Sequence, residues 1–79
     1  MDGFRYTELR PNDLILSVWA DTFQVVISLD NTGDSITCFF NYIDISPRKF
    51  GTIHRVPAYL DDYLPARSFE VYRDGKRIF

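Results

Sequence analysis

The chain of 79 residues has few of the side chains from which catalytic and metal-binding sites are built. It contains one cysteine, Cys38, and one histidine, His54. A single thiol forms neither an internal disulfide nor a zinc site of four thiolates. A glycine-rich phosphate-binding loop, a nucleophile elbow and paired cysteine–histidine spacings are also missing. The sequence therefore predicts a protein that is not an enzyme and that needs no cofactor or metal.

Long apolar runs are missing as well. No stretch of about 18 apolar residues is present, so the sequence predicts no membrane-spanning helix. Residues 1–5 lack the basic and then apolar layout of a secretory signal peptide. Together with the single cysteine, these absences predict a cytoplasmic chain. The length predicts one β-rich domain, 1–79, because so short a chain cannot close two hydrophobic cores.

Aromatic and charged side chains, in contrast, are plentiful. Aromatic residues make up 16% of the chain and charged residues 25%, and the formal net charge is −2. Residues 1–47 hold seven acids and two bases, whereas residues 48–79 hold four acids and seven bases. A fold that interleaves the two segments would cancel this asymmetry, and we expect that outcome. With a pI near 5.1, non-specific attraction to nucleic acid is not the default.

Alternating apolar and polar residues predict strands over most of the chain. A period of two is present at 14–20 and 23–29 and again, with bulky side chains on both faces, at 35–45. A strand that is apolar on both faces is typical of the middle of a sheet. Short polar segments at 21–22 and 30–34 separate these runs and predict hairpin turns.

The second half of the chain predicts further strands and one helix. Residues 50–56 alternate weakly, and 68–72 and 76–79 flank an aspartate–glycine pair, which is a strong hairpin signal. Between them, residues 57–64 carry an apolar stripe at helical spacing. A proline begins this segment and another follows it, so the sequence predicts a short helix there.

These elements predict a mainly β fold. The expected architecture is a small bent antiparallel sheet, or an SH3-like or OB-like partly open barrel, of five or six strands with one short helix near 57–64. So few strands cannot hide two apolar faces while they are flat, which favours a bent sheet or a barrel. An α+β arrangement with the helix laid across the sheet is the second choice.

The candidate catalytic side chains are better explained by structural roles. His54 lies in an alternating segment and is predicted to be a half-buried strand residue. Cys38 lies on a strand face and is predicted to be a small core residue. Asp61 and Asp62 are neighbours on the predicted helix, where successive side chains diverge by about 100° and do not face one metal ion. None of these residues therefore predicts an active site.

Acidic side chains in turns suggest a first candidate function, which is protein binding. Hairpins project their turns, and a carboxylate cluster there complements a partner with a basic surface. If consecutive strands pair, the 21–22 and 30–34 turns lie at opposite ends of the sheet and form one patch only if the sheet curls. Two tyrosines of the predicted helix are candidate aromatic anchors. The predicted partner-binding residues are Asp21, Asp30, Asp34, Asp61, Asp62, Tyr59 and Tyr63.

A lone acidic domain of 79 residues without catalytic motifs resembles the small inhibitors that phages encode, anti-CRISPR proteins in particular. The likeness lies in size, composition and the acidic residues Asp30, Asp34, Asp61 and Asp62. It implies an inhibitor that docks on a CRISPR effector complex in the host cytoplasm and blocks DNA binding. Such inhibitors share no common fold, so the resemblance covers the chain as a class and implies no role for an individual residue.

A nucleic-acid-binding barrel is the second candidate. Small β-barrels combine basic loops with aromatic platforms on which bases stack. The net charge of −2 opposes this function, because affinity for phosphate grows with the number of positive contacts. The basic residues concerned are Arg73, Lys76 and Arg77 in the last hairpin and Arg48 and Lys49 in another loop, with Phe39 or Trp19 as stacking platforms.

Self-association is the third candidate. Phe79 ends the chain in a segment predicted to be a strand, and an uncovered final strand can pair with another copy. This would make the protein a structural component. Otherwise we expect a monomer or a weak homodimer.

Overall fold

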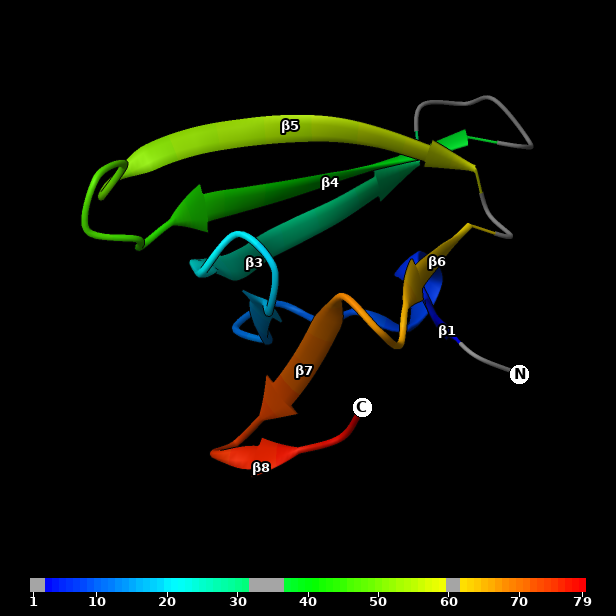
Figure 1. Ribbon diagram of the computed structural model, residues 1–79. Coiled ribbons are helices and arrows are strands. Elements are labelled where there is room, and N and C mark those ends of the chain that lie inside the picture. Colours follow the sequence, from blue (N-terminus) through cyan, green and yellow to red (C-terminus); the bar gives the residue numbers. More distant parts are fainter. Residues whose placement is uncertain (1–2, 32–36, 60–61) are drawn as a thin grey trace.

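The computed structural model describes residues 3–31, 37–59 and 62–79, and within these ranges strand is the predominant structure (Figure 1). The mainly β prediction is therefore confirmed. In chain order the elements are β1 Gly3–Arg5, the 3-10 helix η1 Tyr6–Glu8, β2 Leu14–Ser17, β3 Thr22–Asn31, β4 Thr37–Asp44, β5 Thr52–Tyr59, β6 Tyr63–Pro65, β7 Phe69–Arg73 and β8 Lys76–Arg77.

The strands form two antiparallel sheets. The larger has the order β5-β4-β3-β2-β7-β8, and the smaller pairs β1 with β6. The long strands β3, β4 and β5 curve together across the upper part of Figure 1, and β7 and β8 continue the sheet below them. The larger sheet stays open, because β5 and β8 each have a neighbour on one side only. The fold is thus the bent antiparallel sheet and not a closed barrel.

Local sequence signals account for the hairpins. Arg73 pairs with Lys76 across Asp74 and Gly75, whose φ angles are 53° and 79°. Two successive residues in the left-handed region form the type I′ turn that aspartate–glycine pairs favour. β4, with bulky side chains on both faces, lies inside the sheet between β3 and β5, as its pattern predicts.

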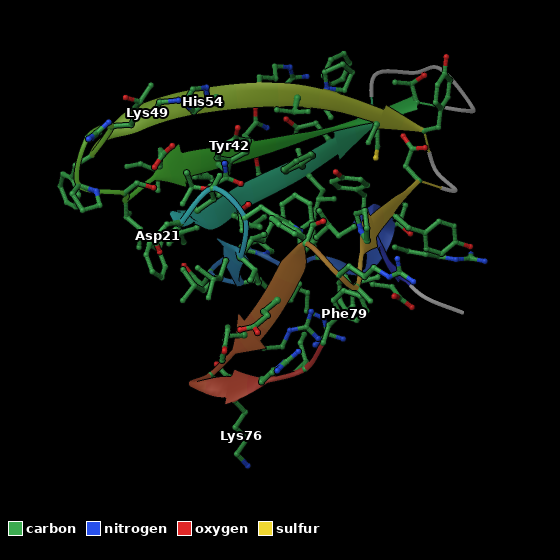
Figure 2. All side chains as sticks on the ribbon, in the orientation of Figure 1. Asp21, Tyr42, Lys49, His54, Lys76 and Phe79 are labelled. Carbon is green, nitrogen blue, oxygen red and sulfur yellow. The ribbon has the colours of Figure 1, made fainter. Side chains whose placement is uncertain are left out.

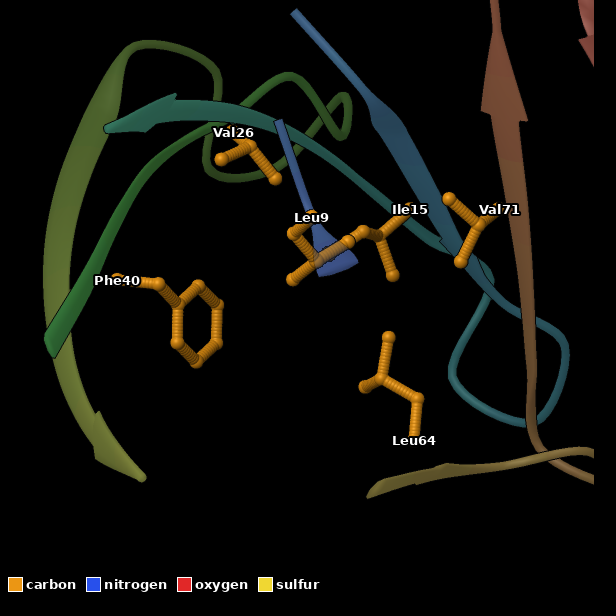
Figure 3. Packing of buried hydrophobic residues seen from close by; sticks show 6 residues of the cluster. All are labelled: Leu9, Ile15, Val26, Phe40, Leu64 and Val71. Carbon is orange, nitrogen blue, oxygen red and sulfur yellow. The ribbon is translucent and has the colours of Figure 1, made fainter. Parts of the chain in front are cut away.

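The hydrophobic core lies between one face of the larger sheet and the small sheet with η1 (Figure 3). Ile15 of β2 pairs with Val71 of β7, and both point into this core. On β4, the ring of Phe40 packs against Tyr6 with 4.9 Å between ring centroids. Burying one such side chain contributes about 1.5–3 kcal/mol. The buried cluster consists of Leu9, Ile15, Val26, Phe40, Leu64 and Val71.

The predicted helix at 57–64 is wrong. β5 continues through Pro57 to Tyr59, and Tyr63 begins β6, so the described residues of this segment are strand except for Asp62. Proline does not end β5, because an edge strand tolerates a residue that donates no hydrogen bond on its open side. The apolar residues at helical spacing do not form one buried face, because Leu64 is buried in β6 whereas Tyr59 is exposed at the end of β5.

Candidate protein-binding surfaces

Asp30 lies near the end of β3 and is engaged by its neighbours. Its Oδ2 atom accepts hydrogen bonds from Arg55 at 2.8 Å and from the Asn41 amide at 2.7 Å. These bonds, that from Arg55 first, hold the pKa of Asp30 below its usual value. The same guanidinium lies 4.3 Å from the ring centroid of Phe39. The charge of Asp30 is therefore compensated within the chain, and the Phe39 ring is covered on one face by a cation.

Asp62 follows β5 and binds the backbone. Its Oδ2 atom accepts a hydrogen bond from the N–H of Tyr59 at 2.8 Å, and its carbonyl oxygen accepts one from the N–H of Tyr6 at 3.1 Å. The Tyr59 side chain is exposed. Tyr63 is half-buried in β6, with the Arg5 guanidinium 5.6 Å from its ring centroid. Asp62 thus ties the end of β5 to the start of η1.

The predicted acidic residues do not gather in one patch of the described structure. Asp21 lies in the β2–β3 turn just before β3 begins, whereas Asp30 lies near its end. Nine residues of straight strand span about 30 Å. Asp34 and Asp61 lie outside the described residues. The structure therefore places Asp21 at one end of the sheet and Asp30, Tyr59, Asp62 and Tyr63 toward the other.

A buried carboxylate, Asp13, forms an ion pair with the half-buried Arg73 and so joins the acidic and basic segments of the sequence. Arg73 donates to both carboxylate oxygens of Asp13, from Nε at 2.9 Å and from Nη2 at 2.7 Å. Asp13 is 1% exposed. Burial raises the pKa of Asp13, but hydrogen bonds from Arg73 and the Arg10 N–H outweigh it, so that the pKa is lower than usual. This arrangement stabilises the fold and occupies Arg73.

The other basic residues of the last hairpin are more accessible. Arg77 lies 3.5 Å from a carboxylate oxygen of Glu70, and Lys76 is exposed at the bottom of Figure 2. Of the three cations proposed for nucleic-acid binding at this hairpin, two therefore contact carboxylates.

His54 and Cys38 lie as the sequence predicts, half-buried on β5 and buried on β4. The His54 ring stacks on Tyr42 with 5.0 Å between centroids, and its Nε2 atom is buried with no hydrogen-bond partner among the described residues (Figure 2). Within the described ranges, no three or more histidine, cysteine, aspartate or glutamate side chains are grouped to hold a metal ion. No helix in these ranges has the length and apolar character needed to cross a membrane.

Exposed apolar side chains gather at the end of the sheet that holds Asp21. Trp19 is 79% exposed in the β2–β3 turn, and Phe50 is 77% exposed in the β4–β5 turn. Val18 precedes Trp19, and Ile53 lies at the start of β5; both are also exposed. Antiparallel pairing of β3 with β4 brings the two turns to the same end. We call these four side chains the turn surface.

A groove of about 520 Å³ separates the two turns, lined by residues 20–22 and 46–49. Backbone hydrogen bonds hold its walls together, since the N–H of Ile45 donates to the carbonyl oxygen of Phe23 at 2.9 Å. In Figure 2, Asp21 and Lys49 lie on the two sides of this region. The turn surface therefore rests on a fixed framework.

A third turn lies next to the turn surface. The N–H of Val18 donates to the carbonyl oxygen of Ser68 at 2.8 Å, which holds the 66–68 turn beside the β2–β3 turn. Arg67 is exposed in that turn.

The alternating strand pattern did not predict that most residues of the turn surface are exposed. Val18 falls in the predicted strand 14–20 and Phe50 in 50–56, and alternation alone does not tell which face of a strand stays exposed. One local signal was present: Phe50 lies between a Pro-Arg-Lys segment and Gly51, and an aromatic residue inside a turn has little chance of burial. For Trp19 the sequence predicts a different role, that of a stacking platform for bases.

Comparison with known proteins adds no relative. No protein-family model, no curated protein and no solved structure matches the chain.

Proposed function

We propose that the chain is a non-enzymatic protein-binding module whose contact surface is the turn surface. The observation that carries this proposal is the exposure of Trp19 and Phe50 on neighbouring turns. Large exposed apolar side chains that cluster on a small domain mark interaction sites, and tryptophan is among the residues that contribute most to binding energy. The paired strands beneath the turns limit the conformational entropy that docking would cost.

The narrower function that the resemblance implies, inhibition of a nucleic-acid-handling complex through carboxylates, stays a prediction. Asp30 and Asp62 are hydrogen-bonded within the chain. Asp21 is exposed and has no carboxylate contact to another described residue. An inhibitor that uses the acidic residues would therefore depend on Asp21 together with Asp34 and Asp61.

A paired-variant capture experiment tests the proposed function. Wild-type chain, Trp19→Ala/Phe50→Ala and the control Ile78→Ala are immobilised, and lysate of the source cells is passed over each. Ile78 is an exposed apolar residue outside the turn surface, which makes it a matched control. We expect a partner whose affinity, measured by calorimetry after purification, falls about 30-fold or more in the double variant and little in the control. Equal affinity of the double variant for that partner would refute the proposal.

A further inference from the structure

Basic side chains border the turn surface. Arg48 and Lys49 precede Phe50 in the β4–β5 turn, and Arg67 lies in the 66–68 turn beside Val18. All three cations are exposed. None of them forms an ion pair with a carboxylate in the described part of the chain.

The acidic side chains at this end cancel that charge only in part. Asp44 is buried, and hydrogen bonds from Ser46, from its hydroxyl and its backbone N–H, hold the pKa of Asp44 below its usual value. Asp21 is the exposed carboxylate that lines the groove. Arg48, Lys49 and Arg67 against the carboxylates of Asp21 and Asp44 leave this end with one net positive charge, although the whole chain carries −2. The charge of the turn surface is therefore opposite in sign to that of the protein.

From this arrangement we infer that the binding partner is a protein whose docking site is an apolar pocket bordered by carboxylates. The inference rests on the proposed function and names the chemistry of its partner. The apolar side chains of the turn surface fill the pocket, and Arg48, Lys49 and Arg67 face the carboxylates at its rim, where charge complementarity guides docking.

The apolar part of the surface favours a protein over a nucleic acid. Val18 and Ile53 are aliphatic and have no ring on which a base can stack, whereas they fit an apolar protein pocket. Three cations also offer few phosphate contacts, and affinity for nucleic acid depends on their number. A partner of mixed apolar and acidic character contacts both the four apolar side chains and the three cations of this region, and leaves Asp21 unused.

Peptide selection tests the inference. A display library of random short peptides is selected on the full wild-type chain and counter-selected on Trp19→Ala/Phe50→Ala. We expect enriched peptides in which an aromatic or aliphatic residue lies next to aspartate or glutamate. A synthetic peptide of that kind should bind Arg48→Glu/Lys49→Glu about tenfold more weakly than wild type, and added salt should weaken its binding to wild type. Lys76→Glu, which reverses an exposed lysine elsewhere, is the control and should change the affinity little.

Each other outcome has a separate meaning. Enriched peptides that are neutral or basic would overturn the inference of an acidic partner, and so would a peptide affinity that the charge reversal leaves unchanged. In both cases, binding that depends on Trp19 and Phe50 would still support the proposed function. A selection that fails to distinguish wild type from the Trp19→Ala/Phe50→Ala variant would overturn both. Tighter binding of an oligothymidine probe than of the peptides, lost in both double variants, would identify a nucleic-acid surface and overturn the inference.

Discussion

The two ends of β3 differ in how their neighbouring side chains are used. At the end near Asp30, polar groups find partners within the chain: Arg55 and Asn41 contact Asp30, and Asp62 accepts the N–H of Tyr59. At the beginning of β3, Trp19 and Phe50 stand exposed on two turns. The comparison separates side chains that bind partners within the chain from side chains that are exposed and free to contact another molecule. Substitutions at the first kind should change stability, and substitutions at the second should change binding.

The largest effect on stability is expected at Asp13, a buried carboxylate whose charge is compensated within the chain. Asp13→Asn leaves the half-buried Arg73 guanidinium without its counter-charge and should lower the free energy of unfolding by about 3 kcal/mol. Urea unfolding at neutral pH measures this change. Asp74→Asn, at an exposed turn position that asparagine tolerates equally well, is the matched control and should stay near wild type. Similar losses in both variants would show that the ion pair has no special importance.

The same carboxylate predicts how stability depends on pH. Because the pKa of Asp13 is lower in the folded chain than in the unfolded one, its contribution is present above about pH 4 and is lost as pH falls through the folded pKa. The difference in unfolding free energy between wild type and Asp13→Asn should therefore shrink below about pH 4. Urea unfolding at a series of pH values follows it. A difference that is the same at pH 3 and pH 7 would contradict the lowered pKa.

The smallest effect is expected where the open edge of β5 is protected. Pro57 has no N–H, and the N–H of Tyr59 is occupied by Asp62, so this part of the edge offers few donors to another strand. Pro57→Val/Asp62→Ala should restore those donors and lower the concentration at which the chain self-associates, as sedimentation velocity would show. The double variant would thus create a binding edge on β5 at the end of the sheet that holds Asp30.

Asp62→Asn is the control for the edge, because its amide oxygen still accepts the Tyr59 N–H. It should sediment like wild type. If the double variant also does so, the protection of β5 does not depend on these two residues, and self-association through this edge loses its support.

Sequence reasoning succeeded where the signal is local. The pattern at 23–29 and the aspartate–glycine turn depend on residues close in the chain, and both appear in the structure. It failed at 57–64, because apolar residues at helical spacing also arise where one strand ends and another begins: Tyr59 is exposed at the end of β5, whereas Leu64 is buried in β6. The position of β5 at the sheet edge, which makes Pro57 tolerable, is a long-range property that no local pattern contains.

The candidate site was predicted less well than the fold. Trp19 was recognised as an exposed aromatic, but Phe50, Val18 and Ile53 were not placed at a surface. The acidic residues were recognised as charged, yet their partners are distant in sequence: Asp30 meets Arg55, 25 positions away. Such pairings follow from strand order and register, and a single sequence without its fold does not specify them.

The amino-acid sequence by itself determined most strands of the larger sheet, the turn chemistry and the scarcity of catalytic and metal-binding side chains, because these follow from residue type and short-range spacing. The tertiary structure decided which carboxylates are compensated, which edge is open and which aromatic side chains face solvent. The physical reason is that burial and charge compensation depend on residues that are distant in sequence and that the fold brings into contact. Here the small sheet and η1 cover one face of the larger sheet, and nothing described covers the turns at its end.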